Sequence, residues 1–176
     1  MRVVSALKKK GVNVRYLTTG AYDPHEPKNV KYYRELKKMV RDLNITREVI
    51  FIAEYRMKNG RKVIRDHTFI RDLYFIADIL FMPSISEGFG LPLIEAGMTK
   101  LPIACSDIPP FLEIGENHIC SFSIADTPDR IADKILRYLA TISTYNMYRK
   151  VIENYAWDSV YQNHVMPLFR KIMRAH

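Results

Sequence analysis

An apolar strand, a glycine-containing loop and an apolar helix follow one another in the middle of the chain. The apolar run 79–82 predicts a β-strand, and Pro83 ends it because proline cannot donate a ladder hydrogen bond. Gly88 and Gly90 allow the loop backbone angles that other residues avoid. Pro92 suits the first turn of the helix. Such a unit directs free N–H groups and the positive end of the helix dipole toward one point, which predicts an anion site.

Strand-like and helical segments alternate along the rest of the chain. Strands are predicted at 12–18, 49–53, 79–82, 101–105 and 118–122. Helices are predicted at 3–10, 28–43, 69–76, 92–98, 128–139, 145–155 and 157–173, with Pro167 bending the last one. This order predicts an α/β fold, a Rossmann-like parallel sheet with helices on both faces. The 176 residues fit a single domain with C-terminal helices at about 128–173.

Two carboxylates stand on either side of the predicted anion site. Glu87 precedes the glycine loop and Glu95 lies about one turn into the helix. Acidic residues in dinucleotide-binding folds accept hydrogen bonds from ribose hydroxyls, so this pair could hold sugar hydroxyls beside a phosphate. A glutamate that only complements the helix dipole is the alternative interpretation.

Charge is uneven along the chain. Residues 1–75 hold 18 Lys and Arg against 8 Asp and Glu, whereas residues 76–176 hold 9 against 11. A basic half could bind nucleic acid, a membrane surface or a phosphorylated small molecule, and it could also be a solvated surface. The basic residues alternate with acidic ones on a predicted helix, and they form no platform with aromatic residues, so no nucleic acid is expected as partner.

The remaining composition indicates a cytoplasmic protein. Cys105 and Cys120 both lie in apolar segments, where buried thiols in a reducing compartment are expected in place of a disulfide. The chain has no apolar run of about 18 residues, so no transmembrane span is predicted. The N-terminus has no long apolar stretch typical of a signal peptide. The histidines and acidic residues show no metal-binding spacing, so neither a metal nor another cofactor is expected.

A longer motif makes the central unit more specific than a generic glycine loop. Two glutamates seven residues apart enclose a Gly-Phe-Gly-Leu sequence and follow a Pro-Ser pair: Pro83-Ser84, Glu87-Gly88-Phe89-Gly90-Leu91 and Glu95-Ala96. This pattern resembles the donor-binding motif of retaining GT-B glycosyltransferases, the group 1 or family 4 enzymes that include glycogen, sucrose and trehalose synthases. The resemblance runs from about Val14 to Trp157.

The resemblance implies a nucleotide-sugar donor site and a role for each motif residue. Backbone N–H groups in the segment Gly88, Phe89, Gly90 and Leu91 contact the donor phosphate, and Glu95 holds the ribose hydroxyls. Glu87 faces the transferred hexose as the residue assigned to catalysis, without a nucleophilic role. Tyr55 lies in the region that is near the nucleotide base in this family.

The resemblance covers only the second of the two Rossmann-like domains of a complete GT-B enzyme. The family's acceptor site lies on the first domain, and the Arg and Lys that neutralise the donor diphosphate precede the part matched here. The chain on its own is therefore expected to bind donor without transferring the sugar, and it could lack the first strand of its sheet. A non-catalytic or nucleic-acid-contacting basic binding module is the alternative function.

Overall fold

The computed structural model describes residues 1–20, 25–56, 60 and 66–174. The contacts of the chain divide it into two compact units, Met1–Ile135 and Leu136–His176. Unit 1 contains all five described strands: β1 (Tyr16–Thr18), β2 (Val49–Phe51), β3 (Leu80–Met82), β4 (Ile103–Ser106) and β5 (Cys120–Phe122). Its helices are α1 (Arg2–Lys9), α2 (Pro27–Asp42), η1 (Ile52–Glu54, a 3-10 turn), α3 (His67–Ile76), α4 (Leu91–Met98) and α5 (Pro109–Gly115).

All strand pairs in the described residues are parallel, as the alternating sequence predicts. They form a two-stranded sheet, β1-β2, and a three-stranded sheet, β3-β4-β5. In the larger sheet Leu80 pairs with Ile103, and Ala104 pairs with Cys120. The crossovers between its neighbouring strands contain α4 and α5, which is the right pattern for parallel strands. The α/β, Rossmann-like prediction is confirmed.

The two sheets meet through aromatic side chains. Tyr16 of β1 contacts Phe81 of β3 edge-on, with 6.4 Å between ring centroids. Phe81 also stacks on Phe122 of β5 at 5.4 Å. The two sheets are thus joined by side-chain packing, and no ladder hydrogen bonds connect their described strands. In open α/β sheets the ligand binds beyond the carboxyl ends of the strands, which is where the loop that follows β3 lies.

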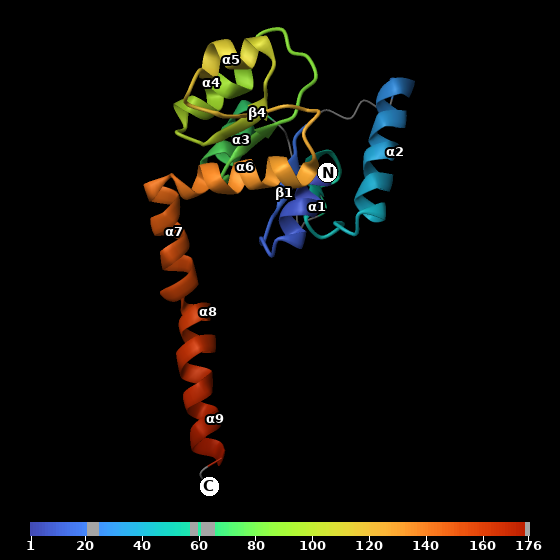
Figure 1. The fold of residues 1–176 in the computed structure, drawn as a ribbon. Helices are drawn as coiled ribbons and strands as arrows, with labels where there is room; N and C mark the ends of the chain where they lie inside the picture. The colour runs from blue at the N-terminus through green and yellow to red at the C-terminus, as the bar shows by residue number, and fades with distance from the viewer. Residues whose placement is uncertain (21–24, 57–59, 61–65, 175–176) are drawn as a thin grey trace. The chain divides into compact units, whose positions relative to one another are not determined.

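Helices α4 and α5 lie side by side over the three-stranded sheet, as Figure 1 shows. Between them and the sheet lies an apolar core: Leu93, Ala96, Leu101, Ile103, Cys105 and Phe111. Both cysteines are buried, as predicted. Burial raises the pKa of the Cys105 thiol to about 11, so this cysteine is a core residue and a poor nucleophile at neutral pH.

Helix α6 (Pro128–Ala140) runs from unit 1 into unit 2. Its first turn is capped by Thr127, whose hydroxyl accepts a hydrogen bond of 3.3 Å from the Arg130 N–H, as the Thr-Pro pair predicts. Unit 2 continues with α7 (Ser143–Asn154), α8 (Trp157–Val160), η2 (Tyr161–Val165, a π-helical segment) and α9 (Met166–Arg174). None of the helices in the described ranges combines the length and the apolar character that crossing a membrane requires.

A π-helical segment, η2, lies directly before Pro167, where the sequence predicts a bend. Proline has no N–H to donate to the carbonyl four residues back, so the regular α-helical ladder cannot continue through this position. The wider turn of η2 joins α8 and α9 at that point.

Candidate functional site

The loop between β3 and α4 ends in a helix N-terminus without a side-chain cap. Strand β3 ends at Met82, directly before Pro83, and α4 begins at Leu91. Gly90 is the N-cap residue and supplies no side-chain hydrogen bond to this end of the helix. Within the described residues, the N–H groups of Phe89, Gly90 and Leu91 donate to no other group. These donors and the helix dipole together favour an anion.

The loop approaches the core so closely at Gly90 that only glycine fits. Its φ is +100°, in the left-handed region. A Cβ atom built there would lie 3.1 Å from the Phe111 ring and 3.3 Å from Ile114. Phe111 is fully buried and cannot move aside readily. The core under α5 thus holds the backbone of the N-cap in one position.

The Glu87 carboxylate is held by a chain of hydroxyl groups. Ser84 donates a 2.8 Å hydrogen bond from Oγ to Glu87 Oε1. The carbonyl of Ser84 in turn accepts a 2.5 Å hydrogen bond from the hydroxyl of Ser106, a fully buried residue at the end of β4. The sheet itself therefore fixes the segment that orients Glu87. The sequence motif contains Ser84, but the contact between Ser106 and Ser84 could not be predicted from the sequence.

Glu95 is exposed on α4 and has a partner on α3. The hydroxyl of Tyr74 donates a 3.0 Å hydrogen bond to Glu95 Oε2. Burial, with a smaller contribution from this hydrogen bond, raises the pKa of Tyr74 to about 12. The phenol is therefore protonated, and a donor, throughout the physiological pH range. Sequence reasoning missed Tyr74, whose partner lies on another helix.

Apolar side chains cover the rim of the site. Phe89 and Leu91 are 58% and 61% exposed, so these two large apolar residues lie largely open to solvent. Tyr55, which follows η1, is half exposed. The turn predicted at Asn59-Gly60 lies largely outside the described residues. The structure thus brings Glu87 and the loop donors to one end of α4, with Glu95 one turn along the same helix.

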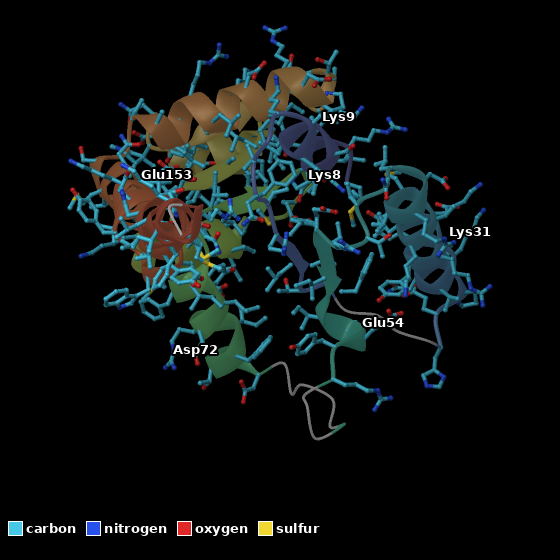
Figure 2. All side chains as sticks on the ribbon, turned by 90° about the horizontal axis from the view of Figure 1, so that it is seen from below. Lys8, Lys9, Lys31, Glu54, Asp72 and Glu153 are labelled. Atoms are coloured by element: carbon cyan, nitrogen blue, oxygen red, sulfur yellow. The ribbon has the colours of Figure 1, made fainter. Side chains whose placement is uncertain are left out.

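The basic residues of the N-terminal half are distributed over separate helices. Figure 2 shows Lys8 and Lys9 on α1 and Lys31 on α2. Several lysines have acidic partners: Lys8 with Glu48 at 3.0 Å, Lys10 with Asp133 at 2.8 Å and Lys37 with Glu54 at 2.6 Å. Such pairing lowers the charge that these helices offer to a polyanion.

Residues 1–156 match the protein family described as "Glycosyl transferases group 1". The chain belongs to the group 1 glycosyltransferases. The matched region contains the whole β3–α4 unit with both glutamates. The family predicted from the Pro-Ser and Glu-Gly-Phe-Gly sequences is therefore confirmed.

Curated members of this group resemble parts of the chain. "Serotype-specific mannosyltransferase WbdA" of Escherichia coli is 48% identical over 61 residues, which are 35% of this chain and 7% of that protein. "O-antigen chain mannosyltransferase RfbU" of Salmonella typhimurium is 36% identical over 86 residues, 49% of this chain and 22% of that protein. The matched part of the chain thus spans less than a quarter of each of these relatives.

A crystal structure in the same family has the same fold. It is the C-terminal domain of a glycosyl transferase group 1 family protein, LpcC, from Francisella tularensis. The two chains are 25% identical with a TM-score of 0.59, and the match covers 92% of this chain and 74% of that one. The expected correspondence to the second half of a GT-B glycosyltransferase is confirmed.

Proposed function

We propose that this chain is the donor-binding part of a retaining hexosyltransferase, which takes its sugar from a nucleoside-diphosphate sugar. The observation that carries the proposal is the N-terminus of α4, where three N–H groups that have no acceptor among the described residues lie between two glutamates in the chain. A nucleoside-diphosphate sugar matches this arrangement, because its diphosphate anion has the hydroxyls of the transferred sugar on one side and those of the ribose on the other. Membership of the glycosyltransferase family gives this geometry its chemical context.

In the proposed reaction, the bond between the anomeric carbon and the donor diphosphate breaks, and the acceptor oxygen bonds to that carbon with retention while its proton passes to the departing diphosphate. Negative charge grows on the departing diphosphate, and the N–H groups of Phe89, Gly90 and Leu91 stabilise it. Glu87 accepts hydrogen bonds from hydroxyls of the hexose and orients the ring. Glu95 holds the ribose. No metal ion is part of this scheme.

Mannose is the first sugar to test, because WbdA and RfbU are both named as mannosyltransferases. Guanosine and uridine diphosphate sugars are suitable probes, since the base is not defined by the residues described above. The acceptor site belongs, in our proposal, to further protein outside these 176 residues. We accordingly expect donor binding by the chain alone and no sugar transfer.

Calorimetric titration of nucleoside-diphosphate sugars tests the donor site. Replacing Glu95 by Ala removes hydrogen bonds to a charged group, so affinity for the bound donor should fall about tenfold or more. Glu35→Ala is the matched control, since Glu35 is exposed on α2 and outside the site. Equal affinity of wild type and Glu95→Ala for every donor tested would disprove the ribose role.

The alternative function, a nucleic-acid-contacting module, makes a different prediction. Binding to phosphate backbones weakens steeply with salt and tolerates many sequences. A gel shift with single-stranded and duplex probes at two salt concentrations, run beside the calorimetry, separates the two functions. Tight, salt-sensitive retention of nucleic acid together with no donor binding would favour the alternative.

A further inference from the structure

We infer that Tyr74 is a positioning residue, which fixes the Glu95 carboxylate for the ribose diol and so makes the site select ribonucleotides over deoxyribonucleotides. The inference rests on the proposed donor function and adds a residue outside the glycine-loop motif. It starts from the hydrogen bond of 3.0 Å between the Tyr74 hydroxyl and Glu95 Oε2, which joins α3 to α4.

Tyr74 is anchored at its ring and directed outward at its hydroxyl. The partly buried ring packs against the core cluster that includes Leu93 and Ala96, two residues of α4 on either side of Glu95 in sequence. The ring therefore moves with the buried face of α4. A rigid aromatic ring with a polar tip is well suited to hold an exposed carboxylate at the helix surface.

Glu95 keeps free acceptor capacity after it has bound Tyr74. An ionised carboxylate has about four lone-pair sites on its two oxygens, and Tyr74 uses one site on Oε2. Two neighbouring ribose hydroxyls can donate to the remaining sites. Tyr74 itself stays a donor because its pKa is raised to about 12 by burial and by the hydrogen bond to Glu95. The Tyr74 hydroxyl thus holds the Glu95 carboxylate so that it can accept hydrogen bonds from the ribose hydroxyls.

Without Tyr74, the Glu95 side chain would lose this contact and would become fixed only when the ligand binds. Glu95 is exposed, and a flexible side chain that is immobilised on binding costs affinity. Losing one ordering contact of this kind should weaken ribonucleotide binding about three- to tenfold. A 2′,3′-dideoxynucleotide offers no hydroxyls to Glu95, so its binding should not change.

The test compares nucleoside diphosphates with their 2′,3′-dideoxy counterparts. GDP and UDP are titrated into the full chain, and the tighter binder and its dideoxy form are then measured on four variants. These are Tyr74→Phe, Glu95→Ala, the double variant, and Tyr148→Phe, which removes an exposed hydroxyl on α7. Tyr74→Phe keeps the ring in the core, and thermal unfolding verifies that each variant is folded.

We expect Tyr74→Phe to lower the ratio of ribonucleotide affinity to dideoxynucleotide affinity about three- to tenfold. The affinity for the dideoxynucleotide should not change. The control variant Tyr148→Phe should have the same affinity ratio as wild type. Glu95→Ala should abolish the preference, and adding Tyr74→Phe to it should have no further effect. A normal ratio in Tyr74→Phe, with the preference lost in Glu95→Ala, would overturn the role of Tyr74 alone. An unchanged ratio in Glu95→Ala, or no binding of either nucleotide, would overturn the donor proposal and this inference together.

Discussion

At the scale of single residues, Gly90 joins the backbone of the site to the core beneath it. Its φ of +100° turns the chain into α4, and the absence of a side chain lets it lie against Phe111. Any L-residue there meets both a backbone and a steric penalty. The position of the unpaired N–H groups therefore depends on this glycine.

Gly90→Ala should lower the free energy of unfolding by about 1–3 kcal/mol, because the new Cβ meets the Phe111 ring and the φ is unfavourable. Gly97→Ala in the same helix is the matched control, since a Cβ there has nothing within 4 Å. That control should be neutral or stabilising by about 0.5–1 kcal/mol. Urea unfolding of both variants measures the difference, and equal effects would contradict the steric argument.

The residues that the sequence predicts best are those whose role depends on their own backbone or on near neighbours. Gly90, Pro83 and Thr127 act locally, so turn and cap chemistry is enough to identify them. Tyr74 and Ser106 act on residues 21 and 22 positions away. Such contacts are created by the packing of α3, β3 and β4, and no pattern in the chain gives their partners.

At the scale of elements, helix α3 contributes to the site through its contact with α4. It begins after Asp66, whose carboxylate caps it by accepting a 2.8 Å hydrogen bond from the Phe69 N–H. The Tyr74–Glu95 hydrogen bond then joins its last turns to the glycosyltransferase motif. The contact has a measurable pH dependence of its own.

Stability at high pH should depend on Tyr74. Its folded-state pKa of about 12 lies above the ordinary tyrosine pKa of about 10, so its contribution to stability is complete below pH 10 and is lost as pH rises through 12. At pH 8 Tyr74→Phe should be less stable than wild type by about 0.5–1.5 kcal/mol through the lost hydrogen bond. Urea midpoints at pH 8 and pH 11.5 should show that this difference shrinks. A difference that stays constant would contradict the assigned titration.

Strand lengths were less predictable than strand positions. The sequence predicts a strand at 12–18, but β1 covers only Tyr16–Thr18. Its partner β2 is equally short, because the chain turns into η1 directly after Phe51. A ladder extends only as far as both strands do, and the length of the partner is not visible in the local sequence.

At the scale of the whole molecule, the sequence predicts one parallel sheet, whereas the described strands form two. The β1-β2 pair and the β3-β4-β5 sheet meet through the rings of Tyr16 and Phe81. Large aromatic side chains at that boundary join the strands by packing and not by a ladder. The fold class was nevertheless predictable, because it depends on the alternation of elements and not on each hydrogen bond.

The site also divides into a part that the sequence predicts and a part that it does not. The sequence predicts Glu87 and the loop donors before the first turn of the helix and Glu95 about one turn into it, and α4 begins and runs accordingly. Their roles toward a donor follow from family resemblance and stay predictions. The hydroxyl groups that hold both carboxylates come from the structure alone, apart from Ser84.

The most direct test of the donor site is the response of individual backbone amides to a ligand. In a ¹H–¹⁵N correlation spectrum of the 176-residue chain, addition of GDP or UDP should shift the amide signals of Phe89, Gly90 and Leu91. The nucleoside without its diphosphate should leave these three signals unchanged, because the helix N-terminus binds the anion. Saturable shifts that occur only elsewhere in the chain, or no shifts at millimolar nucleotide, would contradict the account.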